Sequence, residues 1–318
     1  MPLPDPTLPQ GRAVVLVRNP QAGNYRRVRH RLTEALRDTG LRVVAALDLA
    51  DRYQVRDWTS LPPADRPVVV AAGGDGTVGA VAELLAGTDT TFGILPLGTN
   101  NNVARSLGIP ARVEDAARLL ARGTTVAVDL GRFTPDSGAR RTFLHAAGLG
   151  IQADFARLAA DVTLRRRLGR FTYLVATALA LRRRRPIRCD LILNGRRQSR
   201  RLLYLMVFNV PLFAGPLQLH LASGGITDRQ FDVLAIDVLP LARFLFALAP
   251  MLVGRRPRSP GVHLVRVPGL RIEAPYPLPV ALDGEVVGHV PGSFVIAPAA
   301  LRVFAPPIGA SSTIFRRG

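Results

Sequence analysis

The sequence predicts an α/β domain with a parallel sheet, followed by an antiparallel β-sandwich domain. Strand-like and helix-like segments alternate along the first third of the chain, which is typical of a parallel sheet with helices on both faces. After about Asp129, short strand-like segments separated by turn residues dominate, which is typical of antiparallel β-structure. Apolar residues make up 48% of the 318 residues, enough for two hydrophobic cores.

The elements of the first domain follow from local periodicity. Arg26–Thr39 has helical spacing, because its apolar residues return every three or four positions. Short apolar and β-branched runs bounded by turn residues indicate strands. We therefore expect strands at Ala13–Val17, Leu41–Leu47, Pro67–Ala72 and Phe92–Pro96, and helices at Arg26–Thr39, Val78–Leu85 and Val113–Ala121.

In the rest of the chain, helical patterns are fewer and strand patterns dominate. This predicts a mostly antiparallel β-domain with one or two inserted helices. The strands expected there are Leu191–Leu193, Leu202–Phe208, Phe231–Asp237, Val262–Val267, Leu270–Glu273 and Val280–Leu282.

The composition argues against several classes of protein. Cys189 is the single cysteine and no CxxC or HExxH spacing occurs, which disfavours a disulfide framework or a zinc site and fits a reducing compartment. The N-terminus lacks the features of a signal peptide. The longest apolar runs, Phe171–Leu181 and Phe244–Val253, are well below the roughly 20 residues that cross a bilayer. We expect a soluble, cytoplasmic protein.

Positive charge is concentrated in one stretch. The formal net charge is +19, from 42 basic and 23 acidic residues, and every basic residue counted is arginine. Between Arg165 and Arg201 there are thirteen arginines and one acid, Asp190, which gives this stretch a charge of +12. Such a cluster indicates an anionic partner, namely phosphate, acidic lipid or nucleic acid. A solvated arginine-rich surface without a partner is the alternative.

The clearest chemical signal is the turn Gly73–Thr77, which follows a β-branched strand and precedes a helix. Glycines allow backbone amides to face an anion without a Cβ clash. The helix start adds unpaired donors and a favourable dipole. Because a Walker lysine is absent, we expect backbone amides to bind the phosphates. A tight turn without a ligand would need fewer glycines.

Two further loops leave predicted strands. Leu95–Arg105 carries asparagines and a threonine that would either cap the next helix or hold a nucleotide. Asn19–Gly23 ends the first strand. In a doubly wound sheet, such loops gather at the carboxyl ends of the strands, where ligands bind. The nucleotide-contacting residues that we expect are Asn19, Pro20, Gly23, Gly73, Gly74, Asp75, Gly76, Thr77, Gly98, Thr99, Asn100 and Asn102.

Taken together, these motifs resemble the diacylglycerol kinase catalytic-domain family, in its bacterial lipid kinase branch, with sphingosine and ceramide kinases as relatives. The match extends over nearly the whole chain. The motifs that carry it, in order, are Asn19–Gly23, Gly73–Thr77, Pro96–Asn101, Val128–Gly131, Gly148–Gly150 and Asp283–Glu285.

The resemblance implies a fold of the NAD kinase and diacylglycerol kinase type. Residues 1–130 would form the nucleotide-binding α/β domain, with 298–318 returning to it, and 131–297 the lipid-substrate β-sandwich. The nucleotide would lie in the cleft between them. ATP and Mg²⁺ are the implied cofactors and a lipid is the implied acceptor. A structural magnesium would be held near Asp228, partly by main-chain oxygens around Gly225 and Gln230.

The chain departs from the family pattern at several positions. Ala22 stands where a serine is usual, Ala80 where a glutamate is usual, and Asn102 and Gln152 where acids are usual. Arg229 stands where a glycine follows the metal aspartate. These replacements weaken polar and metal contacts, so the choice of lipid and the activity itself stay open.

Transfer to a lipid hydroxyl needs a carboxylate that accepts the hydroxyl proton. If the segment is extended, Asp283 and Glu285 point to the same face, and the resemblance implies that this motif supplies the proton acceptor. Asp-Gly is also a frequent hairpin turn. Asp75 is the rival base, and its alternative role is to order water and metal.

A lipid kinase must also reach a membrane. Phe244–Val253 is followed by Arg255 and Arg256, and arginines flank Phe171–Leu181. Each segment suits an interfacial helix that docks peripherally on an anionic membrane surface, and each equally suits a core helix with charged ends. Whether the chain forms a homodimer is left open.

Other functions fit parts of the sequence. A soluble small-molecule kinase of the NAD kinase type shares the Gly-Gly-Asp-Gly loop, but Asp283–Glu285 and the absence of an Asn-Glu pair after Thr77 disfavour it. A non-catalytic nucleotide-binding regulator would explain the lost acids. No nucleic-acid partner is expected, because aromatic residues make up only 6% and form no stacking pattern.

Overall fold

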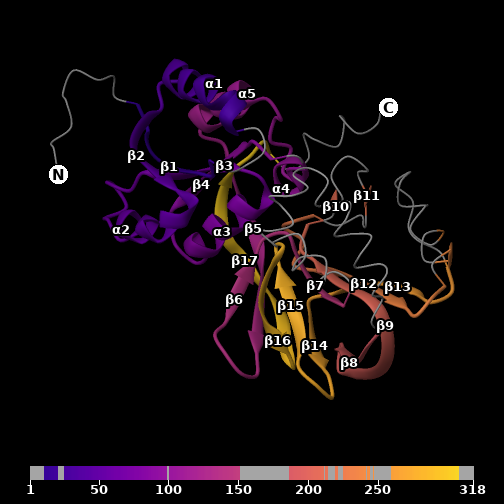
Figure 1. Cartoon of the computed structure of the whole chain (residues 1–318). Helices are drawn as coiled ribbons and strands as arrows, with labels where there is room; N and C mark the ends of the chain where they lie inside the picture. The colour runs from indigo at the N-terminus through magenta and orange to yellow at the C-terminus, as the bar shows by residue number, and fades with distance from the viewer. Residues whose placement is uncertain are drawn as a thin grey trace. The chain divides into compact units, whose positions relative to one another are not determined.

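The computed structural model of the protein (Figure 1) describes residues 11–20, 25–98, 100–150, 186–210, 212–213, 219–220, 225–240, 242–243, 246 and 259–307. Its backbone contacts define two compact units. Unit 1 holds the described chain up to Ala127 and again from Leu301, and unit 2 is Val128–Ala300.

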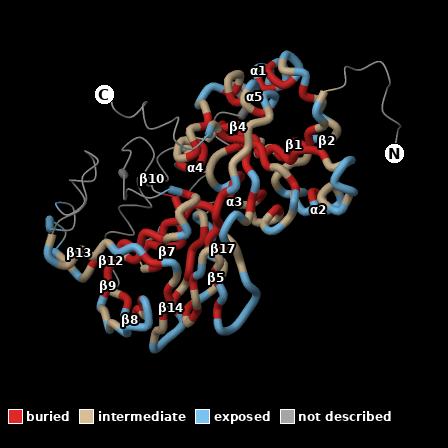
Figure 2. The backbone as a smooth tube through the Cα atoms, turned by 180° about the vertical axis from the view of Figure 1, so that it is seen from behind, coloured by how far each residue is buried: buried red, intermediate tan, exposed pale blue. Residues whose placement is uncertain are grey.

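Unit 1 is built on a parallel sheet. The strands run in the order β2-β1-β3-β4-β17, and every pair is parallel. Their bounds are β1 (Ala13–Arg18), β2 (Arg42–Asp48), β3 (Val68–Gly73), β4 (Thr91–Pro96) and β17 (Gly292–Phe304), of which the last residues belong to this unit. β3 is buried along its whole length (Figure 2), as expected for an apolar strand covered on both faces.

Helices cover both faces of this sheet. α1 and α5 lie side by side on one face, where Arg31 of α1 pairs with Glu114 of α5, and α3 lies on the other (Figure 1). The helical elements are α1 (Tyr25–Asp38), the 3₁₀ helix η1 (Leu49–Gln54), α2 (Val55–Thr59), α3 (Asp75–Leu85), α4 (Asn102–Ser106) and α5 (Val113–Arg122).

Unit 2 is a β-structure, and the strand pairs whose register the structure describes are antiparallel. The strand order is β16-β15-β7-β9-β8-β14-β17. In addition, β12 pairs with β9 and β13 pairs with β12, while β5 pairs with β17 and β6 pairs with β5. The bounds are β5 (Thr125–Pro135), β6 (Arg141–Phe143), β7 (Ala146–Gly150), β8 (Ile187–Leu193), β9 (Arg196–Phe208), β12 (Phe231–Asp237), β13 (Val262–Val267), β14 (Gly269–Glu273), β15 (Leu278–Leu282) and β16 (Glu285–Val290). A short separate hairpin joins β10 (Leu212–Phe213) to β11 (Leu219–His220).

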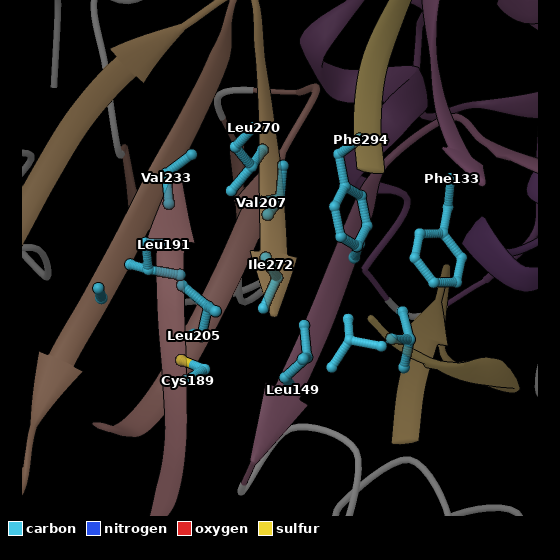
Figure 3. Close-up of a cluster of buried hydrophobic side chains, with 14 of the residues drawn as sticks. Phe133, Leu149, Cys189, Leu191, Leu205, Val207, Val233, Leu270, Ile272 and Phe294 are labelled. Carbon is cyan, nitrogen blue, oxygen red and sulfur yellow. The ribbon is translucent and has the colours of Figure 1, made fainter. Parts of the chain in front are cut away.

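The long strand β9 organises the core of unit 2. Its first half pairs with β8, and its second half lies between β7 and β12. Side chains from these strands meet in one apolar cluster (Figure 3), in which Phe133 and Phe294 stack with ring centroids 4.6 Å apart. Cys189 belongs to this cluster, and burial raises the pKa of its thiol to about 11.

The predicted fold class, a parallel α/β domain followed by an antiparallel β-domain, is confirmed. The predicted strands at Phe231–Asp237 and Val262–Val267 match β12 and β13 residue for residue. β6, β7 and β16 were not predicted. Among the helices that the structure describes, none has the length and apolarity needed to cross a bilayer.

Candidate functional site

The first glycine-rich turn joins β3 to α3 in unit 1. Gly73 ends the strand, and α3 begins at Asp75 with Gly74 as its N-cap. A Cβ added to Gly73 would lie 2.4 Å from the Thr77 hydroxyl oxygen and 2.5 Å from its Cβ. Glycine is therefore required at position 73 by the protein's own packing.

The second loop meets the first through their glycines. A Cβ on Gly98 would lie 2.4 Å from the Cα of Gly74, so the two backbones are in direct contact. The Leu97 amide also donates to the Gly73 carbonyl at 2.9 Å. Asn101 closes the second loop, because its side chain accepts from the Gly98 amide and donates to the Gly98 carbonyl, both at 2.9 Å.

Asp75 connects the first turn to α4. Its two carboxylate oxygens accept from the backbone amides of Asn102 and Val103, each at 3.0 Å. A carboxylate at a helix start is favourable, because it satisfies unpaired amides and complements the helix dipole. Asp75 therefore positions the second loop.

Gly76 differs from the other glycines of this site. It is exposed in the first turn of α3, and a Cβ added there would have no atom of the chain within 4 Å. The amides of Asp75, Gly76 and Thr77 begin the helix, and none of them donates a hydrogen bond within the described part of the chain. Open space beside unpaired helix-start amides is what an anion needs.

The first loop lies beside this turn. Asn19 donates from its backbone amide to the Ala72 carbonyl at 3.3 Å, and its side-chain amide lies 3.5 Å from the Thr77 hydroxyl. The structure thus brings Asn19, Gly73–Thr77 and Gly98 together in unit 1. Pro20 is half-buried next to Asn19, and Asn100 is exposed in the second loop. Gly23 and Thr99 lie outside the described residues.

In unit 2, the geometry of the late acidic motif corrects one expectation. Asp283 and Gly284 form the two-residue turn of the β15–β16 hairpin, with φ of +47° and +93°. The segment is therefore not extended, and Asp283 and Glu285 do not share a strand face. The hairpin-turn interpretation of Asp-Gly is correct, because both turn residues must adopt the left-handed conformation that these residue types tolerate.

The Asp283 carboxylate is held by backbone. Oδ2 accepts from the Leu144 amide at 2.8 Å, and Oδ1 accepts from the amides of His145 and Ala146 at 2.9 and 3.0 Å. Burial raises the pKa of this carboxyl, while the nearby His145 and the three amides oppose the shift. Glu285 is exposed at the start of β16. The two acids therefore have different surroundings, and Asp283 has the perturbed one.

The residues expected to bind a structural magnesium do come together, in the turn before β12. However, Asp228 already accepts from the Gly225 amide at 2.6 Å, from the Gln230 amide at 3.0 Å and from the Arg266 guanidinium at 2.5 Å. The Gly225 carbonyl accepts from the Asp228 amide at 3.2 Å. Magnesium needs close octahedral oxygen ligands. Asp228 Oδ2 already accepts from an amide and from the guanidinium, Oδ1 accepts from a second amide, and the fixed positive charge of Arg266 lies against the carboxylate, so this turn does not fit the ion.

Asp129 was predicted only as part of the motif Val128–Gly131, but in the structure it connects distant segments of unit 2. Its carboxylate accepts from the backbone amides of Arg229 and Ala299 at 2.9 and 2.8 Å, and its own amide donates to the Ile226 carbonyl at 2.8 Å. Asn209 donates to the Asp129 carbonyl at 2.9 Å. The sequence does carry a signal for this role of Asp129. An acid that lies between two apolar residues which are buried, Val128 and Leu130, requires hydrogen-bond partners.

Some of the described arginines of the basic stretch form ion pairs or hydrogen bonds, and others are exposed. Arg197 pairs with Asp190 and Glu273, and Arg200 contacts Gln198. Arg188 and Arg201 are exposed. The remainder of the stretch up to residue 185, with Phe171–Leu181, lies outside the described residues, as does most of Phe244–Val253.

The fold and the paired glycine turns define a class of protein, namely one with a parallel α/β unit that carries paired glycine-rich turns, followed by an antiparallel β unit. Two family models match in order. The diacylglycerol kinase catalytic domain covers residues 13–133, and the YegS C-terminal NAD kinase beta sandwich-like domain covers residues 146–305. The chain therefore belongs to the diacylglycerol kinase catalytic-domain family, in the branch with a YegS-type C-terminal domain.

Individual proteins give the same result. The chain is 29% identical over 303 residues to a diacylglycerol kinase of Mycobacterium tuberculosis strain H37Rv, covering 93% of this chain and 96% of the relative. It is 27% identical over 234 residues to a diacylglycerol kinase of Bacillus subtilis strain 168, covering 72% and 74%. The crystal structure of a diacylglycerol kinase from Bacillus anthracis str. Sterne has the same fold, with a TM-score of 0.64 at 18% identity over 94% of this chain and 98% of that one.

Proposed function

We propose that the protein is an ATP-dependent lipid kinase that transfers the γ-phosphate of ATP to a hydroxyl of diacylglycerol or a related lipid. Family membership supports a kinase. The observation that carries the proposal is the open space at Gly76 beside the unpaired amides of α3. Backbone amides at a helix start bind phosphate without a lysine, and ATP would arrive with its magnesium as part of the substrate.

We assign the role of proton acceptor to Asp283. One lone pair of Oδ2 is left after the Leu144 amide is satisfied, because each carboxylate oxygen accepts about two hydrogen bonds. A raised pKa makes a carboxylate a better base for a hydroxyl. The three amides fix the carboxylate in one orientation, and positioning is most of what phosphoryl transfer asks of a protein.

The test is a transfer assay with purified full-length protein, radiolabelled ATP, Mg²⁺ and separate acceptors. The acceptors are diacylglycerol, sphingosine, ceramide and NAD. We expect label in an extracted lipid, and a loss of roughly 10²–10⁴-fold in rate for Asp283→Asn. Glu285→Gln is the matched control and should retain most activity, because Glu285 is exposed and two residues away.

The outcomes separate the competing functions. Labelled NAD without labelled lipid would show a small-molecule kinase, and ATP binding without any product would show a regulator. An asparagine at position 283 cannot accept hydrogen bonds from all three amides, so the variant is less stable. Asp283→Asn is therefore assayed at a temperature where circular dichroism shows the native spectrum. Equal rates for Asp283→Asn and wild type would refute the assignment of the base.

We further propose that the protein docks on anionic membrane surfaces. Phe246 is 74% exposed, and Arg243, three positions before it in the sequence, is exposed as well. An exposed aromatic residue with a basic neighbour in the chain is typical of interfacial binding. Flotation with vesicles should recover the protein with anionic lipid and much less with neutral lipid, and Phe246→Ser should reduce recovery. Equal recovery with both vesicle types would argue against the electrostatic part of this docking.

A further inference from the structure

We propose that the guanidinium of Arg266 is the resident cation of the turn formed by residues 225–230, so that this turn needs no metal ion. The proposal concerns the fold of unit 2 and does not depend on kinase activity. Arg266 was not among the residues expected to act at this turn.

The geometry places Arg266 between two carboxylates. It lies on β13 directly opposite Asp232 of β12 in the antiparallel ladder. Its Nη2 is 2.5 Å from Asp228 Oδ2, and its Nε is 3.4 Å from Asp232 Oδ1. One planar group therefore reaches an acid of the turn and an acid of the following strand, which is the use to which arginine is best suited.

Arg266 is a positive neighbour of both acids. Asp232 is 5% exposed, and β12 lies between β9 and β13. A carboxylate that is buried without a cation or hydrogen bonds is strongly unfavourable. Asp228 is less buried, with a side-chain exposure of 27%, and it accepts two amides of its own turn. Arg266 supplies positive charge to both.

A divalent ion would have to compete with this arrangement. It would need the Asp228 oxygens that Gly225, Gln230 and Arg266 already occupy. It would also stand within a few ångströms of a fixed positive charge, and like charges at that distance repel strongly. Arg229 fixes the backbone of the same turn, because it has φ of +58° and its amide donates to the Asp129 carboxylate. Removing the Arg266 charge should therefore open a metal site that the wild type lacks.

The test measures the melting temperature without nucleotide, in EDTA and in millimolar Mg²⁺. Wild type should melt at the same temperature in both. Arg266→Gln should melt about 3–8 °C lower in EDTA and should recover part of that loss in Mg²⁺. The matched control is Arg271→Gln, because Arg271 has the same 36% side-chain exposure and also contacts two acids, Asp136 and Glu273. It should melt lower than wild type but should not respond to Mg²⁺.

Two results would overturn the proposal. One is a wild-type protein that Mg²⁺ stabilises and EDTA destabilises. The other is an Arg266→Gln protein that folds and gains no response to Mg²⁺.

A second measurement covers the case in which Arg266→Gln does not fold. Mn²⁺ binding is followed by electron paramagnetic resonance in wild type and in Asp228→Asn, again without nucleotide. Equal binding supports the proposal, because Asp228 then holds no metal in the wild type. Loss of a bound Mn²⁺ in Asp228→Asn would contradict it. Any weak binding at the nucleotide loops is common to both proteins and cancels in the comparison.

Discussion

At the scale of single residues, carboxylates that accept backbone amides recur through both units. Asp75 accepts two amides of α4, Asp129 accepts two from distant segments, and Asp283 accepts three from the β6–β7 turn. Charge-assisted bonds of this kind are stronger than bonds between neutral groups. Each acid thereby fixes a loop that the ladder hydrogen bonds alone would not fix.

The glycines of the first turn allow packing and ligand binding to be tested separately. Gly76→Ala should leave stability unchanged or slightly raised, since alanine is favoured over glycine in a helix by about 0.5–1 kcal/mol. ATP affinity should fall at least ~10-fold, which corresponds to about 1.4 kcal/mol, because the new methyl group would occupy the open space beside the amides. Thermal melting and equilibrium binding of ATP measure the two effects.

Gly73→Ala is the contrasting variant in the same turn. Its Cβ would overlap the Thr77 side chain, and overpacking of this kind costs about 1–3 kcal/mol. Gly288→Ala controls for glycine replacement in general, because its Cβ would make an ordinary contact with Phe133 at 3.7 Å. Unchanged ATP affinity in Gly76→Ala would remove the observation on which the proposed function rests.

At the scale of elements, the sequence indicated those strands and helices whose patterns are local. β3 is an unbroken β-branched run that is buried throughout, and its periodicity and its turn are both visible in the chain. β16 was not predicted, because only Val290 of its residues is buried and it is a strand only through its pairing with β15. β7 consists largely of alanine and glycine, and it too is defined by its neighbours β9 and β15.

The same distinction applies to the candidate site. The glycine turns were predictable because their chemistry is contained in a few consecutive residues. The surroundings of Asp283 and Asp129 were not, since their partners lie about 140 and 170 positions away in the chain. No local pattern could show that Asp283 accepts the Leu144 amide or that Arg266 reaches Asp228.

A network of ion pairs joins three strands of unit 2 on their outer face. Arg271 of β14 bonds to Asp136 and Glu273, and Arg197 of β9 bonds to Glu273 and to Asp190 of β8. Hydrogen bonds from Arg271 lower the pKa values of Asp136 and Glu273 below their usual range. The network therefore uses part of the arginine charge that the sequence suggested was available to a partner.

This network should give stability a defined dependence on pH. A carboxyl whose pKa is lowered by folding stabilises the protein above its unfolded pKa and loses that contribution as pH falls through the folded pKa. The usual values are 3.8 for Asp136 and 4.5 for Glu273. Arg271→Ala should therefore lower the melting temperature at neutral pH, and the difference from wild type should shrink as pH falls below these values.

Arg201→Ala is the control for this prediction. Arg201 is exposed on β9, and it forms no ion pair with any residue that the structure describes. Its replacement should produce a small change that does not vary with pH in the acidic range. An Arg271→Ala difference that stayed constant from neutral pH down to pH 3 would show that the network does not stabilise the fold through these carboxyls.

At the scale of the whole molecule, one strand belongs to both units. β17 pairs with β14 through residues 292–295 in unit 2, and Arg302 and Val303 pair with β4 in unit 1. The last part is buried against the core of unit 1, with Leu301, Val303 and Phe304 each at most 3% exposed. Arg12 contacts the ring of Phe304 and donates to the Leu120 carbonyl. Unit 1 is thus completed by residues from the far end of the chain.

Leu301→Ala should therefore weaken unit 1, although residue 301 lies more than two hundred positions from the glycine turns. Removing a fully buried leucine side chain costs about 2–5 kcal/mol. Trp58, the single tryptophan of the sequence, lies in α2 of unit 1, so its fluorescence reports the unfolding of this unit. We expect Leu301→Ala to unfold at a lower denaturant concentration than wild type, as followed by Trp58 fluorescence, and to lose ATP binding at that same concentration.

Arg302→Ala, which changes the exposed neighbour on the same strand, should leave both the unfolding midpoint and ATP binding unchanged. If Leu301→Ala unfolded with the wild-type midpoint, the end of β17 would not be needed to complete unit 1.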